Sequence, residues 1–173
     1  MSAVTRIALL LAGWGLQRLH DARLQTAEVS GMTIAYPEGW LPLPALPPAV
    51  AQWTDNQGFG ATLTLFASPA PSGDTPFALS TSNPAVGQPA YTPIRSVPIA
   101  IGNVAAVQSD YAYARQQVAT SSPPEIVLGR DITWTANGQQ YELVLEAPER
   151  DWSRVEPLFE SLARTAVTAG GAA

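Results

Sequence analysis

The amino-acid sequence predicts an α+β fold: an antiparallel β-sheet of about six or seven strands with a C-terminal helix packed on it, preceded by a single N-terminal membrane helix. Three observations support this prediction. Short runs of alternating apolar and polar residues recur between turn-forming residues, an Asn-Gly pair joins two such runs near the C-terminus, and the longest apolar run lies at the start. With 173 residues, 16 prolines and 13 glycines, the chain suits one domain of short strands rather than a helical bundle.

The N-terminal apolar run covers residues 7–16, I-A-L-L-L-A-G-W-G-L, with Arg6 before it and Arg18 after it. Three interpretations are open: a retained membrane anchor, a cleaved signal peptide and a buried helix. A signal peptide needs a small-residue cleavage site, and residues 19–24, L-H-D-A-R-L, contain no A-x-A pattern. The 17 residues from position 3 to 19 form about 25 Å of helix, which can cross roughly 30 Å of hydrocarbon if both arginines snorkel. We favour the retained anchor.

This interpretation divides the chain into three parts. Residues 1–24 are the membrane anchor and its stalk, residues 25–168 are the folded domain, and residues 169–173 are a disordered tail. Because residues 20–30 are mostly polar, we expect an extended stalk there and the first strand only after it.

The formal net charge of −5 is distributed unevenly. Residues 1–24 contain three arginines and one aspartate, a balance of +2, so the remainder carries −7. A domain this acidic is repelled by phosphate backbones and by anionic lipid headgroups, so we expect no nucleic-acid partner. Cysteine is absent, which excludes disulfides, thiolate catalysis and a lipidated N-terminal cysteine.

Seven runs have the alternation and turn-forming borders of strands. They are residues 31–36, 49–53, 61–66, 94–101, 104–113, 126–135 and 139–146. Four prolines in residues 42–48 predict an extended crossover, and Gly102-Asn103 predicts a tight turn. Six further prolines in residues 68–93 predict a long loop without a helix.

The last two runs form a predicted β-hairpin. Asn137-Gly138 favours a two-residue type I′ turn between them. Counting outward from this turn pairs Trp134 with Tyr141 and Ile132 with Leu143, so that one face receives an aromatic and an aliphatic pair.

A C-terminal helix is predicted from apolar residues at helical spacing. These are Trp152, Val155, Phe159, Leu162 and Ala166. Asp151 and Ser153 are candidate N-caps, and Ser153 with Glu156 matches a capping box. Because proline is tolerated in the first turn of a helix and not deep inside it, we expect the main helix to start near Pro157.

Several of these segments together resemble a known family. They are Tyr36–Trp40, Y-P-E-G-W, the hairpin around Asn137-Gly138, residues 141–148, Y-E-L-V-L-E-A-P, and the helix that contains Pro157 and Phe159. Over residues 30–167 the pattern is similar to the PsbP-like family, whose members include extrinsic subunits of photosystem II, nuclear-transport cofactors and bacterial lipoproteins. The resemblance implies an antiparallel sheet flanked by helices and a non-enzymatic accessory or docking role. The chain departs from the family by its proline-rich residues 68–93, where such proteins often carry a helix.

The residue types needed for most catalytic sites are missing or badly placed. The single histidine, His20, lies in the expected stalk, and no G-x-S-x-G motif is present. Without cysteine or a second histidine, zinc, bis-histidine haem and iron–sulfur sites are not expected. We therefore expect no catalytic residue, no metal and no cofactor.

Carboxylates of the final hairpin are the remaining candidates. Glu142 and Glu146 share the face opposite to Trp134, but four residues separate them by about 13 Å, more than the roughly 5–9.5 Å of glycosidase pairs. Asp131 should face Val144, near both glutamates, where a weak calcium site is conceivable. A solvated acidic sheet face is the favoured interpretation.

Two further patterns have structural explanations. Gly58-x-Gly60 lacks the third glycine and the following helix of a phosphate-binding loop. The tryptophans can line a ligand pocket, but their positions in the strand and helix patterns favour core packing. They are Trp40, Trp53, Trp134 and Trp152.

Together these observations predict a non-catalytic, membrane-anchored accessory subunit of a multi-subunit membrane complex, such as an electron-transfer or photosynthetic one. Its partners are the other subunits and, through the N-terminal helix, the lipid bilayer, where small residues such as Ala12, Gly13 and Gly15 permit close helix approach. The domain is expected on the extracytoplasmic, periplasmic side. The alternative is a secreted or tethered module that binds a small ligand.

Overall fold

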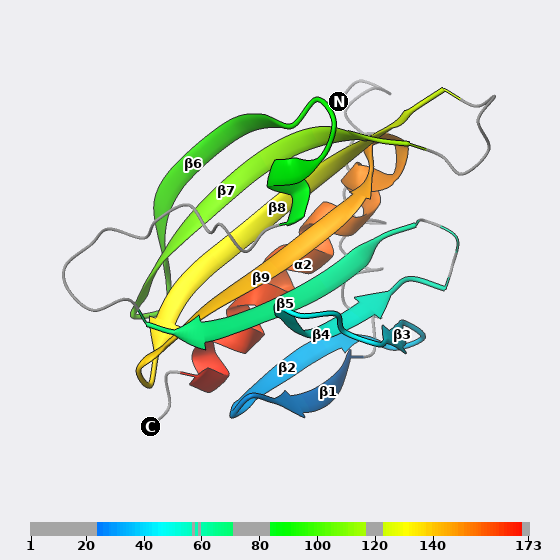
Figure 1. Ribbon diagram of the computed structural model, residues 1–173. Helices are drawn as coiled ribbons and strands as arrows, with labels where there is room; N and C mark the ends of the chain where they lie inside the picture. Colours follow the sequence, from blue (N-terminus) through cyan, green and yellow to red (C-terminus); the bar gives the residue numbers. More distant parts are fainter. Residues whose placement is uncertain (1–23, 57, 59, 71–83, 117–122, 171–173) are drawn as a thin grey trace, which may run out of the picture.

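A computed structural model describes residues 24–56, 58, 60–70, 84–116 and 123–170 of the chain. In this part, seven antiparallel strands form one sheet in the order β3-β4-β5-β9-β8-β7-β6, and two strands form a small sheet, β1-β2. A single long helix, α2, lies across one face of the large sheet (Figure 1). The predicted α+β class with an antiparallel sheet and a C-terminal helix is confirmed.

The strands and helices have the following bounds: β1 Leu24–Val29, β2 Met32–Pro37, β3 Leu41–Leu43, β4 Ala49–Thr54, β5 Thr62–Pro69, the 3₁₀ helix η1 Pro84–Gly87, β6 Thr92–Ile101, β7 Val104–Arg115, β8 Glu125–Ala136, β9 Gln139–Pro148 and α2 Glu149–Gly170. All seven runs predicted as strands are strands.

Two strands were not predicted. Residues 24–29, expected to belong to a stalk, form β1, which pairs with β2 through a tight turn. Ser30 and Gly31 adopt positive φ angles of 50° and 75° in this turn, the backbone shape that joins two antiparallel strands. The stalk prediction is therefore wrong from Leu24 onward. The second unpredicted strand, β3, lies within the proline-rich crossover and pairs with β4.

The final hairpin has the predicted register. Asn137 and Gly138 have φ angles of 52° and 70°, as a type I′ turn requires. Trp134 pairs with Tyr141, whose ring stacks on the indole at 5.6 Å between centroids, and Ile132 pairs with Leu143.

The main core lies between the large sheet, the small sheet and α2. It contains 20 buried residues, among them Leu63, Leu65, Leu143, Leu145 and Phe159. The inward residues of β8 and β9, together with β2 of the small sheet, meet the apolar face of α2 here, which is the usual layering of a helix on an antiparallel sheet. This core fixes α2 against the sheet and so determines which polar side chains meet at its border.

Helix α2 begins at Glu149, eight residues before Pro157, so the predicted start near Pro157 is wrong. Val155 and Asp151 are buried, which shows that the turns before the proline are packed against the domain. Pro157 and Ser153 are both exposed. The carbonyl that loses its helical partner at Pro157 therefore faces solvent, where water can satisfy it.

The face of the sheet opposite α2 carries a second, smaller core. It consists of Phe66, Ala85, Tyr111, Tyr113, Val127 and Val144, with Tyr91 packed against it. Ala85 belongs to η1, a short 3₁₀ helix inside the segment predicted to have none. The residues around η1 thus cover a sheet face that the sequence predicted to be solvated.

No helix among the described residues is long and apolar enough to cross a membrane. The predicted N-terminal membrane helix and His20 lie outside the described residues. Helix α2 extends to Gly170, into the segment predicted as a tail from residue 169.

Candidate functional site

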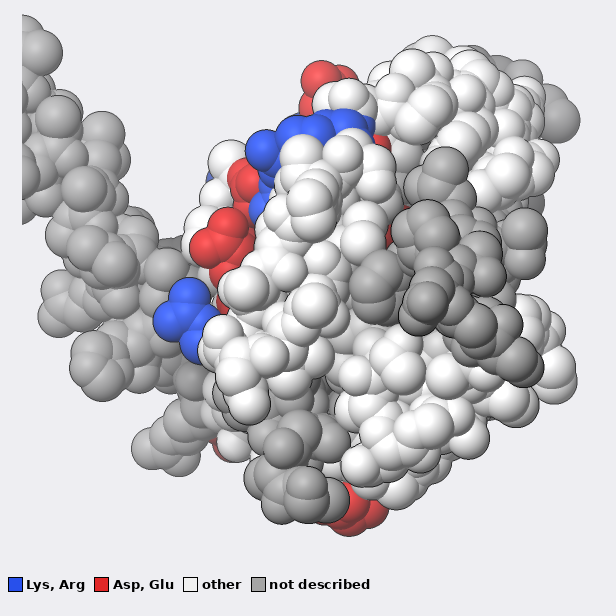
Figure 2. All heavy atoms as spheres, turned by 90° about the vertical axis from the view of Figure 1, so that its left-hand side faces the viewer, with Lys and Arg blue, Asp and Glu red and all other residues white. Residues whose placement is uncertain are grey.

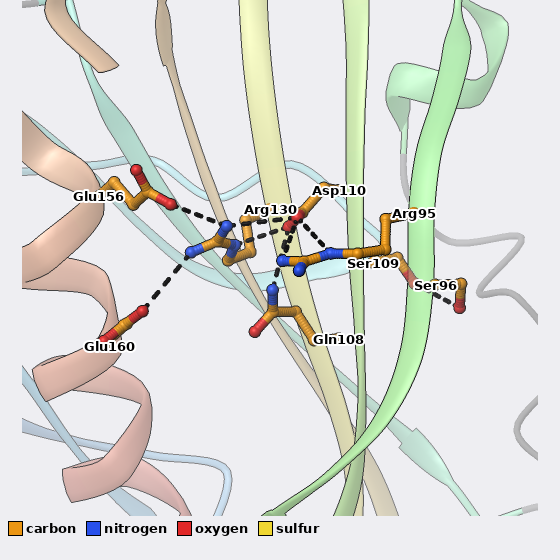
Figure 3. Close-up of polar contacts among 8 residues, drawn as sticks. All are labelled: Arg95, Ser96, Gln108, Ser109, Asp110, Arg130, Glu156 and Glu160. Atoms are coloured by element: carbon orange, nitrogen blue, oxygen red, sulfur yellow. Dashed lines mark hydrogen bonds and ion pairs between the residues drawn. The ribbon is translucent and has the colours of Figure 1, made fainter. Parts of the chain in front are cut away.

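The most extensive polar cluster lies where α2 meets β6, β7 and β8, and Arg130 is at its centre (Figure 3). We call Arg95, Asp110, Arg130, Glu156 and Glu160 the Arg130 cluster. Arg130 Nε lies 2.6 Å from Asp110 Oδ1, and one terminal nitrogen of Arg130 lies 2.8 Å from Glu156 Oε1. The other terminal nitrogen is 3.8 Å from Glu160 Oε1. On the opposite side of Asp110, Arg95 approaches to 2.7 Å.

Strand register explains how these residues meet. Arg130 lies two and four residues before Ile132 and Trp134, so all three share the face of β8 that α2 covers. The side chain of Arg130 therefore points towards the helix. Asp110 is the direct partner of Arg130 on β7, and Arg95 is the partner of Asp110 on β6, next to a register shift. Three adjacent strands therefore place their charged groups in one row.

Burial makes this row electrostatically strong. The side chains of Arg130 and Asp110 are only 8% and 15% exposed. Burial opposes the charge of Asp110, but the hydrogen bonds and positive charge of Arg130, and then of Arg95, outweigh it and lower the pKa of this carboxyl. Asp110 therefore stays ionised, and the guanidinium of Arg130 is held in a fixed position between sheet and helix.

The helix side of the cluster is more open. Glu160 is 65% exposed and Glu156 36%. These two carboxylates lie four residues apart on one helix face, a like-charge pair that destabilises an isolated helix. The Arg130 guanidinium offsets this repulsion and also lies 5.9 Å from the ring centre of Trp152.

Within the five residues of the Arg130 cluster, three carboxylates face two guanidinium groups. On the side of the molecule drawn in Figure 2, acidic and basic side chains lie next to one another in one band, and most of the remaining described surface is uncharged. A fixed set of partly exposed charges of this kind can bind a protein surface with complementary charges.

A second polar cluster lies on the opposite face of the sheet, around Glu146. The hydroxyls of Tyr111 and Tyr113 donate hydrogen bonds to its two carboxylate oxygens, at 3.1 and 3.2 Å. Arg115 donates to the hydroxyl of Tyr113 at 3.2 Å. Burial raises the pKa of Glu146, and the Tyr111 hydrogen bond, the charge of Arg115 and the Tyr113 hydrogen bond offset only part of this effect.

Gly129 makes the contact between Tyr111 and Glu146 possible. The three residues occupy one row across β7, β8 and β9, with Gly129 in the middle. A Cβ atom at position 129 would collide with the ring of Tyr111. The missing side chain therefore lets the tyrosine ring lie over β8 and reach the carboxylate on β9.

The prediction of a solvated acidic face is wrong. Glu142 and Asp131 are buried, with 2% and 9% of their surface exposed. Burial raises the pKa of Tyr91, and the charges of Asp131 and Glu142 raise it further, so this tyrosine lies near both carboxylates. The physical reason for the error is the second core, whose covering residues come from a segment 40 or more residues earlier in the chain.

The other sequence candidates occupy structural positions. Trp40, Trp53 and Trp134 are buried in the main core, as predicted, and Trp152 is half-buried beside Arg130. Gly58 and Gly60 both have positive φ angles, and strand β5 rather than a helix follows them. In the described part of the chain, no three His, Cys, Asp or Glu residues have a metal-binding arrangement. The calcium site considered for Asp131, Glu142 and Glu146 is thus not assembled by these residues.

Both clusters consist of polar side chains that pair with one another across neighbouring elements. In the Glu146 cluster both tyrosine hydroxyls donate hydrogen bonds to the carboxylate, so two donors from β7 hold a carboxylate of β9 across β8. In the Arg130 cluster the buried Arg130 and Asp110 form an ion pair, and the more exposed carboxylates of Glu156 and Glu160 lie on the helix side of it. The arrangement is suited to holding strands together and to presenting charge.

Sequence reasoning missed both clusters, although each left a signal. Arg130 interrupts the apolar face of a strand otherwise marked by Ile132 and Trp134, which indicates a buried and paired charge. Gly129 lies inside a strand pattern, which indicates a close approach by a neighbouring group. Their partners could not be found in this way because Asp110 and Tyr111 lie on another strand.

The sequence matches no family model and no curated protein. Solved structures do match. The solution structure of cyanobacterial PsbP from Synechocystis sp. is 20% identical, covers 83% of this chain and 91% of its own, and has a TM-score of 0.59. The chain has the PsbP-like fold. The resemblance noted on the sequence is thus confirmed at the level of the fold.

Two more solved structures share this PsbP-like fold. The Ran-binding protein Mog1p of Saccharomyces cerevisiae is 8% identical, covers 86% of this chain and 95% of its own, and has a TM-score of 0.57. LpqN of Mycobacterium tuberculosis, described as involved in cell envelope biogenesis, is 14% identical, covers 88% and 91%, and has a TM-score of 0.50. At these identities the likeness concerns the fold alone.

Proposed function

We propose that this chain is a non-catalytic accessory protein, anchored to a membrane by its N-terminal segment, that docks onto a multi-subunit membrane complex with its PsbP-like domain on the extracytoplasmic side. The observation that carries the docking role is the Arg130 cluster. It presents Glu156 and Glu160 on one helix face, while the buried Arg130–Asp110 pair keeps them in place.

Stability alone does not account for this arrangement. Exposed ion pairs contribute little to stability, and Glu160 is exposed and makes a longer contact with Arg130, 3.8 Å, than Glu156 does. A like-charge pair on one helix face is unfavourable unless something binds it. Within the domain, Arg130 binds it in part. A basic side chain from a partner protein could pair with the exposed carboxylate of Glu160.

The anchoring role rests on the sequence. Residues 7–16 are apolar and flanked by arginines, and the region behind them offers no clean signal-peptide cleavage site. The fold is compatible with protein binding, since yeast Mog1p, which shares it, is described as Ran-binding. This comparison is an analogy of fold, and the partner of the present chain is defined here only by its location and its basic charge.

A deletion tests the anchoring. Full-length protein and a variant lacking residues 1–19 are expressed in the native host, and mild detergent extracts of the membranes are separated on native gels. We expect the full-length protein to migrate with a large complex and the deletion variant to be released into the soluble fraction. Migration of the full-length protein as a free monomer would disprove the proposal.

A charge reversal tests the docking surface. Glu160→Arg is expected to reduce the affinity for the complex by about tenfold, since it places a positive charge against a basic partner. Glu149→Arg, the same charge change at another exposed position of α2, serves as the matched control and should leave complex formation unchanged. Equal binding by both variants would exclude the Arg130 cluster as the docking surface.

A further inference from the structure

Strand β3 and the turn after it form an exposed segment without polar side chains. Residues 41–48 read L-P-L-P-A-L-P-P, and all of them except Ala45 are exposed. We call these eight residues the Leu-Pro ribbon. Leu46 is 78% exposed and Leu41 52%. No charged residue occurs between Gly39 and Thr54, so the surroundings of the ribbon along the chain are uncharged as well.

Exposed apolar residues of the described chain are concentrated at this place. The described residues include seven large apolar residues that are exposed, and four of these, Leu24, Leu41, Leu43 and Leu46, belong to the ribbon or its vicinity. Leu24 pairs with Pro37, whose carbonyl accepts a hydrogen bond from the amide of Trp40, the residue before the ribbon. In Figure 1 the strands β1, β2 and β3 accordingly lie together at one end of the molecule. Such a concentration marks an interaction surface rather than scattered surface residues.

The ribbon is not built to receive another strand. β3 is the edge strand of the large sheet and pairs only with β4. Prolines at positions 42, 44, 47 and 48 lack the N–H groups that an added strand would need. The ribbon can therefore make contacts through its apolar side chains but not through backbone hydrogen bonds. This favours contact with an apolar phase over the addition of a strand from another protein.

The start of the described chain indicates which apolar phase is close. Leu24 begins β1, and the apolar run of the N-terminal segment ends at Leu16. Eight residue steps reach at most about 28 Å, even when fully extended. If the run is in a bilayer, the ribbon end of the domain is thus kept near the same bilayer.

We propose that the Leu-Pro ribbon, together with Leu24, inserts into the interfacial region of the lipid bilayer and orients the domain on the membrane. This inference rests on the proposed anchoring of the N-terminal segment. The ribbon carries no charge, and the acidic domain is not attracted to anionic headgroups. The contact with the bilayer therefore depends on apolar side chains. It does not require anionic lipids, and salt should not weaken it.

The absence of cysteine from the chain makes a direct test possible. Full-length protein carrying Leu46→Cys is labelled with an environment-sensitive fluorophore and reconstituted into vesicles of phosphatidylcholine that contain doxyl-labelled lipid. Ile126→Cys is the matched control, an exposed apolar residue on β8. Since β8 is four strands from β3 in the sheet, β8 lies about 19 Å across the sheet from the strand that leads into position 46.

We expect the lipid to quench the label at position 46 several-fold more than the label at position 126, in low and in high salt. Adding Leu41→Ser and Leu43→Ser should remove most of the difference. Equal quenching at both positions in protein that floats with the vesicles would overturn this inference and leave the anchoring intact. Protein that does not float with the vesicles would overturn the anchoring itself. A label at position 46 that is unquenched in vesicles but shielded in native membranes would also overturn the inference, because the ribbon would then contact a protein.

Discussion

The two edges of the seven-stranded sheet differ in the type of side chain they carry and in the contacts those side chains make. At the β6 edge, Arg95, Asp110 and Arg130 form a row of ion pairs that continues to α2. At the β3 edge, Leu41, Leu43 and the prolines around them are exposed and make no polar contribution. Charged residues thus support the fold at one edge, whereas apolar residues face outward at the other.

At these two edges, charged residues contribute to stability and apolar residues do not, which is the opposite of their usual contributions. Buried apolar residues normally stabilise a domain, and exposed charges contribute little. Here the Arg130 cluster is partly buried and bridges three strands and a helix, while the leucines of the ribbon bury little surface. We infer that the ribbon is available for an external contact because the fold does not depend on it.

The largest expected effect is at Arg130. Arg130→Met leaves the largely buried Asp110 with the exposed Arg95 as its remaining cationic partner, and should lower the free energy of unfolding by about 3 kcal/mol in urea titrations. Combining Arg130→Met with Asp110→Leu should recover part of the loss, since the buried carboxylate is then removed. A single variant within about 0.5 kcal/mol of the wild type would refute the view that this edge depends on its charges.

Gly129→Ala should have the next largest effect. The added methyl group collides with the ring of Tyr111, which must move away from Glu146. We expect a loss of about 1–3 kcal/mol in the free energy of unfolding, typical of overpacking. Gly102→Ala serves as a control for the loss of a glycine, because its Cβ meets no neighbour and only its positive φ is strained. Unchanged stability of Gly129→Ala would show that Tyr111 can be displaced freely.

The pH dependence of stability separates the two carboxyl groups. The folded state lowers the pKa of Asp110, so this group stabilises the fold above its ordinary pKa of about 3.9 and the contribution disappears as the pH falls through the folded value. The folded state raises the pKa of Glu146, so its contribution is complete below the ordinary pKa of about 4.3 and disappears as the pH rises through the raised value.

Urea titrations across pH therefore have two expected outcomes. Asp110→Asn should flatten the loss of stability on the acid side, and Glu146→Gln should flatten the decline that begins above pH about 4.3. A pH profile that neither substitution changes would contradict the assigned burial and pairing of these groups.

The smallest effect is expected at the ribbon. Leu43→Ser and Leu46→Ser should change the free energy of unfolding by less than about 0.5 kcal/mol, because both side chains are exposed. Leu65→Ala in the core is the matched comparison and should lower it by about 2–5 kcal/mol. A ribbon variant as destabilised as the core variant would mean that the leucines serve the fold.

Much of the fold could be predicted because its signals are local. The Asn137-Gly138 turn fixes the register of the last hairpin, and alternation identifies seven strands. These local signals gave wrong predictions where residues far apart in the chain determine the structure. Pro157 lies inside α2 because packing of the preceding turns outweighs the proline penalty, and Glu142 is buried because residues near Ala85 cover its face.

The candidate sites were harder to predict for the same reason. Arg130 and Gly129 break their strand patterns, which marks them as unusual, but the sequence does not show that Asp110 and Tyr111 are their partners. The Leu-Pro ribbon is fully visible in the sequence as four prolines among leucines. Only the structure shows that these leucines are exposed at an edge.

One measurement tests the central contrast between the edges most directly. Single cysteines at position 46 and at position 161, the exposed neighbour of Glu160 on α2, are introduced into the full-length protein. They are reacted with a membrane-impermeant maleimide in phosphatidylcholine vesicles and in native membranes, in both cases with the domain on the side of the reagent. The account predicts that position 46 is protected in both preparations, and that position 161 is reactive in vesicles and protected only in native membranes. Equal reactivity of the two positions in both preparations would contradict it.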